Sequence, residues 1–156
     1  MDVGSRLDSE DASIPRVQRF AVVPVPKPRM TVRDKWEKRP AVQRYRDFCD
    51  LLRLHGARLP SMYAAAFEIP MPRSWSPAMR AAMVGTRHLS QPDASNCVKA
   101  LEDALVPEDQ VLHCIAASKS WAETPRITIY NIAAAGEEGR EALLEWYQTA
   151  RKGAAN

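Results

Sequence analysis

Residues 92–105 of this chain read PDASNCVKALEDAL. Its apolar residues recur at the spacing of three and four that is typical of an amphipathic α-helix. At 100° per residue, one stripe must face a core. That stripe consists of Cys97, Val98, Leu101, Ala104 and Leu105. Asn96, Lys99 and Asp103 fall on the opposite side, so the helix presents a polar face next to its buried one.

The segments on either side of this helix follow strand and helix patterns in turn. Strands are predicted at residues 19–25, 61–69, 110–118 and 126–132, and helices at 41–54, 77–84 and 137–152. Proline-rich and glycine-containing stretches separate them. The resulting order, β-α-β-α-α-β-β-α, predicts an α+β domain in which helices pack on one small mixed β-sheet.

The length of 156 residues favours a single domain. An apolar content of 46% and a charged content of 26% are those of a globular protein, which excludes wholesale disorder. Residues 1–14 are acidic and lack any period, so we expect a disordered tail there. We therefore place the domain at residues 15–152, with a second short tail at 153–156.

Several classes of protein are excluded by what the sequence lacks. No apolar run approaches the roughly 20 residues of a membrane-spanning helix, and no apolar segment follows the polar N-terminus as in a secretory signal. The three cysteines have no C-x-x-C spacing, which argues against a disulfide framework and against a zinc ribbon. We expect a cytoplasmic protein without a membrane partner.

Charge is distributed unevenly along the chain. Residues 16–58 contain twelve Lys and Arg against four acids, whereas residues 93–125 contain six acids against two lysines. A basic half beside an acidic cluster is typical of a protein that binds a polyanion and holds a cation at its catalytic site. A solvated surface with uneven charge is equally compatible with these counts.

The acidic cluster has the composition of a metal site. Its members are Asp93, Asp103, Glu108 and Asp109, with Lys99 among them. Carboxylates are the preferred ligands of hard divalent cations, and such a cation activates water and offsets charge on a phosphate during hydrolysis. A capped amphipathic helix with a merely solvated polar face explains the same residues.

A basic loop precedes the first long helix and contains Lys27, Arg29, Arg33 and Lys35, with Trp36 interleaved. Lys and Arg neutralise the phosphate backbone of a nucleic acid, and an aromatic ring can stack on an unpaired base. The loop is therefore a candidate phosphate-gripping arm, with a solvated loop as the alternative. His88, just before the acidic motif, either contacts phosphate or has no functional role.

Taken in order, these features resemble the RusA family of Holliday junction resolvases. The resemblance extends over most of residues 18–132. It is carried by Pro26-Lys27-Pro28-Arg29, by IPMPRSWS at residues 69–76, by His88, and by the spacing P-D-x-x-N-x-x-K-x-x-x-D-A-L at residues 92–105.

This resemblance implies a homodimeric endonuclease that depends on Mg²⁺, with Mn²⁺ as a possible substitute and no nucleotide cofactor. Enzymes of this family nick four-way DNA junctions during recombination and repair, and phages often carry them. The implied catalytic residues are Asp93, Lys99 and Asp109. The implied metal ligands are Asp93 and the acidic pair Glu108 and Asp109, and Asp103 from the acidic cluster is a further candidate ligand. Arg73, His88 and Asn96 then join the basic loop in binding branched DNA.

Two departures from the family pattern keep alternatives open. Ser95 stands where the family has a second aspartate, and a hydroxyl is a poor ligand for a hard dication. The connection between Leu105 and Gln110 is also short, so either Glu108 or Asp109 can be the ligand. A catalytically degenerate DNA-binding protein of the same fold is the main alternative, and a metal-dependent phosphodiesterase acting on nucleotides is a third.

Overall fold

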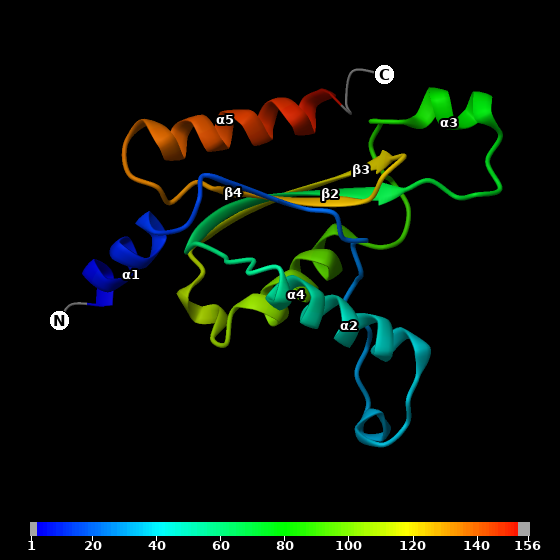
Figure 1. Cartoon of the computed structure of the whole chain (residues 1–156), viewed down its shortest axis with the longest axis horizontal. Coiled ribbons are helices and arrows are strands. Elements are labelled where there is room, and N and C mark those ends of the chain that lie inside the picture. Colours follow the sequence, from blue (N-terminus) through cyan, green and yellow to red (C-terminus); the bar gives the residue numbers. More distant parts are fainter. Residues whose placement is uncertain (1–2, 153–156) are drawn as a thin grey trace.

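The computed structural model describes residues 3–152, and Figure 1 shows one sheet with helices on both of its faces. The strands are β1 (Val17–Phe20), β2 (Met62–Pro70), β3 (Cys114–Ala122) and β4 (Arg126–Asn131). The α-helices are α1 (Val3–Ala12), α2 (Pro40–Leu54), α3 (Pro77–Met83), α4 (Ala94–Leu105) and α5 (Glu137–Lys152). Two 3-10 turns, η1 (Val32–Lys35) and η2 (Asp109–Val111), complete the described part. The expected α+β class is confirmed.

The sheet is mixed, as the sequence predicts, and its strand order is β1-β4-β2-β3. β2 lies at its centre, parallel to β3 and antiparallel to β4. The connection from β2 to β3 contains α3 and α4, because parallel neighbours need a long crossover. β3 starts four residues later than expected, since η2 occupies the beginning of the predicted strand.

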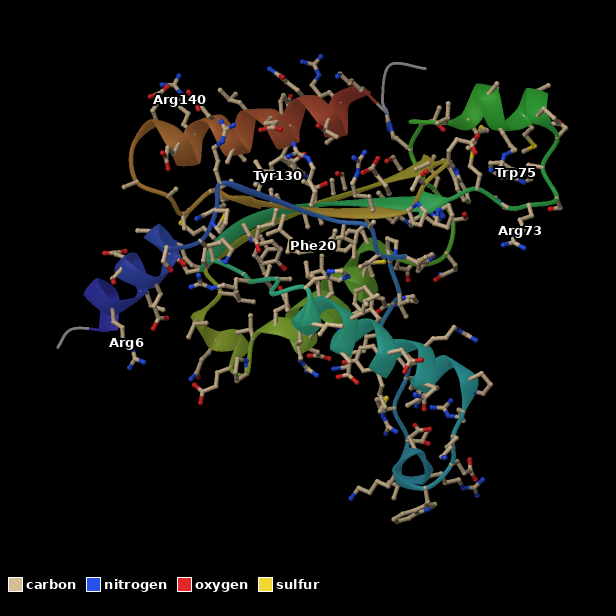
Figure 2. The ribbon with its side chains drawn as sticks, viewed as in Figure 1. Arg6, Phe20, Arg73, Trp75, Tyr130 and Arg140 are labelled. Atoms are coloured by element: carbon tan, nitrogen blue, oxygen red, sulfur yellow. The ribbon has the colours of Figure 1, made fainter. Side chains whose placement is uncertain are left out.

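Alternation along β2 divides the structure into two cores. Tyr63 and Phe67 face α2 and α4, whereas Ala64 and Ala66 face α5. Figure 2 shows that β1 and β4 divide in the same way, with Phe20 of β1 on the α2 side of the sheet and Tyr130 of β4 on the α5 side. The larger core lies under α4, so the helix with the acidic motif rests on the best-packed part of the molecule.

The predicted apolar stripe of α4 is confirmed. Cys97, Leu101 and Ala104 are buried, and Val98 and Leu105 pack against the same core. On the facing helix, α2 buries Val42, Phe48, Cys49 and Leu52. These contacts fix the rotation of α4 about its axis and thereby decide which of its residues meet solvent.

The N-terminal segment differs from the expected disordered tail. Residues 3–12 form helix α1, and Asp11 near its end is buried. The Asp11 carboxylate accepts hydrogen bonds from Ser61 N (2.8 Å) and Ser61 Oγ (2.5 Å), and the Asn131 amide donates to the Asp11 carbonyl. These bonds attach the segment to the sheet despite its polar composition. Residues 153–156, the other expected tail, lie outside the described residues.

α5 covers the face of the sheet opposite α4 and is the longest helix. Ala142 is buried against the sheet, and Trp146 Nε1 donates to the carbonyl of Ala65 on β2 (3.1 Å). Within residues 3–152, neither α5 nor any other helix has the length and apolar content needed to cross a membrane.

Candidate functional site

Asp93 lies at the N-terminus of α4, as its position in the motif predicts. It is the N-cap residue, but its carboxylate accepts no hydrogen bond from the helix backbone. Instead Asp93 Oδ1 accepts a hydrogen bond from Gln91 Nε2 (3.0 Å), and the residue is exposed. The unsatisfied N–H groups and the dipole of a helix N-terminus favour negative charge nearby. An exposed carboxylate at this point is available to hold a cation next to a bound phosphate.

The loop that leads to Asp93 is held by a lysine that the sequence-based predictions did not single out. Lys119 Nζ donates to the carbonyls of Ser90 (2.8 Å) and Pro92 (2.7 Å). Lys119 pairs with Phe67 in the parallel register of β2 and β3, and therefore lies on the face of the sheet that α4 covers. A lysine in the middle of the strand sequence CIAASKSWA was the available signal.

The segment before this loop extends the sheet. Gly85 N donates to Trp121 O (2.8 Å), Trp121 N to Thr86 O (3.0 Å), and His88 N to Lys119 O (3.2 Å). These bonds line the outer edge of β3 with residues 85–88. The chain therefore reaches Asp93 along a supported path rather than through a loose loop.

His88 lies in the interior, although the sequence predicts a contact with DNA. Only 2% of its surface is exposed, and its ring packs on Trp121 with centroids 4.0 Å apart. Burial lowers the pKa of His88, and the nearby charge of Lys119 lowers it further. The structure therefore assigns His88 a packing role beneath the site.

Trp75 continues this aromatic cluster, with its ring centroid 4.8 Å from that of Trp121. Figure 2 shows Trp75 and Arg73 on the loop between β2 and α3, at the end of the molecule remote from α1. Arg73 is exposed, as a DNA-binding role requires.

The first turns of α4 present a short polar surface beside Asp93. Ser95 and Lys99 are exposed and four residues apart, so they lie on one face of the helix. Asn96 is half-buried, and its carbonyl accepts a hydrogen bond from Lys27 N (3.0 Å). This bond attaches the start of the basic loop to the helix that Asp93 begins.

Asp103, predicted as a metal ligand, is kept apart from Asp93 by the length of the helix. Ten residues of α-helix rise about 15 Å. The Asp103 carboxylate instead forms an ion pair with Lys27 Nζ (2.5 Å) and accepts a hydrogen bond from the Tyr45 hydroxyl (2.8 Å). Burial of Tyr45 and its bond to Asp103 raise the pKa of the phenol. Asp103 and Lys27, expected in separate roles, thus neutralise each other.

The acidic pair at 108–109 also lies far from Asp93 along α4. The twelve residues of α4 rise about 18 Å between them. The sheet shows the same separation. Soon after η2, His113 N donates to Ser61 O, just before the start of β2. The Asp93 loop is instead held by Lys119, which lies farther along β3. Glu108 is exposed and accepts a hydrogen bond from Gln110. The side chain of Asp109 lies outside the described residues.

No group of three or more His, Cys, Asp or Glu side chains gathers into a metal site among the described residues. One chain therefore provides, at the start of α4, one exposed carboxylate, the neutral oxygens of Ser95 and Asn96, and the ammonium of Lys99. Such a set can hold a cation weakly and can bind phosphate.

Comparison with known families gives one match. The family model described as Endodeoxyribonuclease RusA matches residues 21–130, a span that includes the basic loop, α2, the Asp93 loop, α4 and the acidic pair. Neither the curated proteins nor the solved structures gave a match. Since the match covers more than two thirds of the chain, the chain belongs to the RusA family of endodeoxyribonucleases.

Proposed function

We propose that this protein is a structure-selective endonuclease that hydrolyses phosphodiester bonds in branched DNA, with four-way junctions as its substrate. The observation that carries the proposal is the arrangement at the start of α4, where exposed Asp93 and Lys99 stand beside the attached basic loop in a chain of an endodeoxyribonuclease family. Arg29, Arg33, Lys35 and Arg73 then position the arms of the substrate through its phosphates. Lys27, which is paired with Asp103, attaches the loop to α4.

The residues around Asp93 fit a weakly held Mg²⁺ ion, for which Mn²⁺ can substitute. Mg²⁺ is commonly bound by only one or two carboxylates together with waters and substrate phosphate oxygens. Asp93 supplies one such carboxylate, and Ser95 and Asn96 lie within the same turn of helix. When bound, the ion supplies water activation and neutralisation of phosphate charge.

We assign two tasks to the chain's own side chains. The Asp93 carboxylate holds the cation and orients the attacking water beside the helix N-terminus, where a phosphate is favoured. The Lys99 ammonium, up to two turns farther along α4, stabilises the charge that develops on the scissile phosphate and its leaving oxygen. Water attacks phosphorus and releases a proton to solvent, the P–O bond to the leaving sugar oxygen breaks, and that oxygen takes up a proton from solvent.

The distance between Asp93 and residues 108–109 supports a homodimer. A four-way junction is two-fold symmetric, so a C2 dimer presents equivalent sites to opposing strands. In such a dimer, the acidic pair of one copy can lie beside Asp93 of the other, whereas within one chain the rise of α4, about 18 Å, lies between them.

A mixing experiment tests this arrangement. One variant is Asp93→Asn, and the other combines Glu108→Gln with Asp109→Asn. If each site combines residues from two chains, mixed dimers contain one intact site and regain cleavage of one strand, although each variant alone is inactive. If each site lies within one chain, no mixed dimer contains an intact site, and the mixture stays inactive.

Ser95 supports a second candidate, a DNA-binding protein of the same fold that has lost catalysis. A carboxylate at position 95 adds a ligand one residue from Asn96, so Ser95→Asp distinguishes the two candidates. If the natural protein nicks junctions in Mg²⁺ and Ser95→Asp only lowers the Mg²⁺ concentration required, the protein is an enzyme. If cleavage occurs only after the substitution, the degenerate function is correct.

A further inference from the structure

The basic loop, residues 26–39, is a built arm rather than a loose connection. Figure 1 shows it, with η1 near its end, extending away from the sheet beyond the start of α2. The arm is attached at its base because Lys27 N donates to Asn96 O on α4. The internal geometry of the arm depends on one buried acid.

That acid is Asp34, of which 2% is exposed. Arg39 binds it in a bidentate pair, with Nε 2.5 Å from Oδ1 and Nη2 2.7 Å from Oδ2. Thr31 donates its N–H and hydroxyl to the same carboxylate, and Arg46 donates to the Asp34 carbonyl (3.1 Å). The Arg39 guanidinium, with smaller contributions from Thr31, holds the pKa of Asp34 well below its usual range. These bonds join the two sides of the arm and limit its freedom.

The network leaves both apolar and charged side chains of the arm exposed. Trp36 is 73% exposed and Val32 is 75% exposed, and the cations Arg33, Lys35 and Lys38 lie among them on exposed positions. The other three tryptophans are partly buried, two in the aromatic cluster under the site and one bonded to β2. Trp36 therefore contributes little to the core, and the arm presents it to solvent in a fixed setting.

We propose that the arm is a preformed platform on which Trp36 stacks against an unpaired DNA base. This inference rests on the proposed action on branched DNA and deepens it. Cations that neutralise phosphates beside an aromatic face are the combination used by proteins that bind single strands. Because the platform is ordered before binding, little entropy is lost when the base docks.

The reach of the arm defines where that base lies. Lys27 and Val32 are five positions apart, so the start of η1 lies within about 18 Å of the first turn of α4. The four further residues to Trp36 run through this 3-10 turn and add about 8 Å. At 3.4 Å per nucleotide of one strand, the resulting limit of about 26 Å is about eight nucleotides. The base held by Trp36 therefore lies within about eight nucleotides of the phosphate that Asp93 approaches.

Binding without divalent metal tests the platform independently of cleavage. The probes are an oligothymidine, a junction with unpaired bases at its centre, and a fully paired duplex. Trp36→Ala is expected to weaken binding of the first two roughly 5- to 100-fold, the effect of losing one stacked base, and to leave duplex binding nearly unchanged. Trp36→Phe retains most of the affinity. Leu54→Ala, which removes an apolar side chain 83% exposed at the far end of α2, changes nothing.

Salt dependence separates stacking from charge. Trp36→Ala should leave the slope of log K against log salt unaltered, whereas Arg33→Ala with Lys35→Ala should reduce it by about 0.7 per lost contact on a single strand. Equal losses on duplex and unpaired probes, or no loss for Trp36→Ala, overturn the platform. Trp36-dependent binding to anionic phospholipid vesicles without a Trp36 effect on DNA also overturns it and identifies a membrane-binding arm.

The two proposals fail in different ways. If the protein cleaves junctions in Mg²⁺ but Trp36→Ala binds unpaired probes as well as the unaltered protein, the platform is refuted and the nuclease stands. If no junction is cleaved but the oligothymidine quenches Trp36 fluorescence and binding requires the ring, the platform stands and the nuclease is refuted.

Discussion

Replacing Lys119 by methionine should loosen the loop that carries Asp93. The substitution keeps a long apolar stem and removes the ammonium that donates to Ser90 O at 2.8 Å and Pro92 O at 2.7 Å. A hydrogen bond from a charged donor contributes about 1.5–3 kcal/mol. Since the site is only partly buried and water can reach the carbonyls, we expect the free energy of unfolding to fall by about 2–4 kcal/mol. For a domain of this size, Tm then falls by roughly 4–16 °C.

Thermal unfolding followed by circular dichroism measures the loss, and amide hydrogen exchange locates it. Exchange should accelerate first at residues 90–94, and junction cleavage should fall further than the folded fraction does. Lys152→Met, a change at an exposed position in the last turn of α5, is the matched control and should leave Tm unchanged. An unchanged Tm together with unchanged exchange at residues 90–94 in Lys119→Met would show that the hydrogen bonds of Lys119 do not hold this loop.

Three further predictions concern the site and the arm. Lys99→Ala should reduce junction cleavage roughly 10²–10³-fold, the effect of losing one electrostatic donor, with little change in binding. If the variant loses binding but the bound fraction is cleaved at the normal rate, Lys99 only binds DNA and has no catalytic role. Asp103→Asn should change stability by less than about 1 kcal/mol, because the Lys27–Asp103 pair is about one-third exposed (36% and 37%). The Mg²⁺ concentration for half-maximal cleavage should also stay the same, and a marked increase would place Asp103 among the ligands. The folded-state pKa of Asp34 is depressed, so its stabilisation of the arm is complete above the ordinary aspartate pKa of about 3.9 and disappears only as pH falls through the lower folded value. The NMR signal of the Trp36 indole N–H should therefore hold its position from pH 7 to pH 4, and Arg39→Gln should move its transition up towards pH 4; a transition near pH 4 in the unaltered protein would contradict the assigned cause.

The regular spacing of apolar residues predicted the helices well, because the residues on the apolar side of a helix are the ones that become buried. The stripe from Cys97 to Leu105 faces the core as expected, since a helix on a sheet can bury only one side. Strand ends were less predictable, because Val111, the last residue of the turn η2, and Leu112 after it are apolar like the strand beyond them. α1 was missed because the bonds of Asp11 to Ser61, and not an apolar stripe, hold the segment in place.

The exposure of the polar side chains of α4 was predictable, but their contacts with other parts of the chain were not. Asp93 and Lys99 are exposed on one helix, as their positions imply. The ten-residue spacing already separates Asp103 from Asp93 by about 15 Å, but the ion pair of Asp103 with Lys27 depends on the fold and was not predictable. His88 is buried because residues 85–88 line β3, a pairing that its loop composition does not indicate. Lys119 Nζ donates a hydrogen bond to Pro92 O, 27 residues earlier in the chain, and this contact depends on the fold.

We propose that this chain cuts branched DNA with the residues at the start of α4. The most direct measurement is cleavage of a labelled four-way junction and a matched linear duplex by the purified protein, with and without Mg²⁺, alongside Asp93→Asn. We predict symmetric nicks in the junction only, dependent on Mg²⁺ or Mn²⁺ and absent in the variant, which should still bind. Equal weak binding of both DNAs without nicks in either metal, or equal cleavage by Asp93→Asn, would contradict the claim.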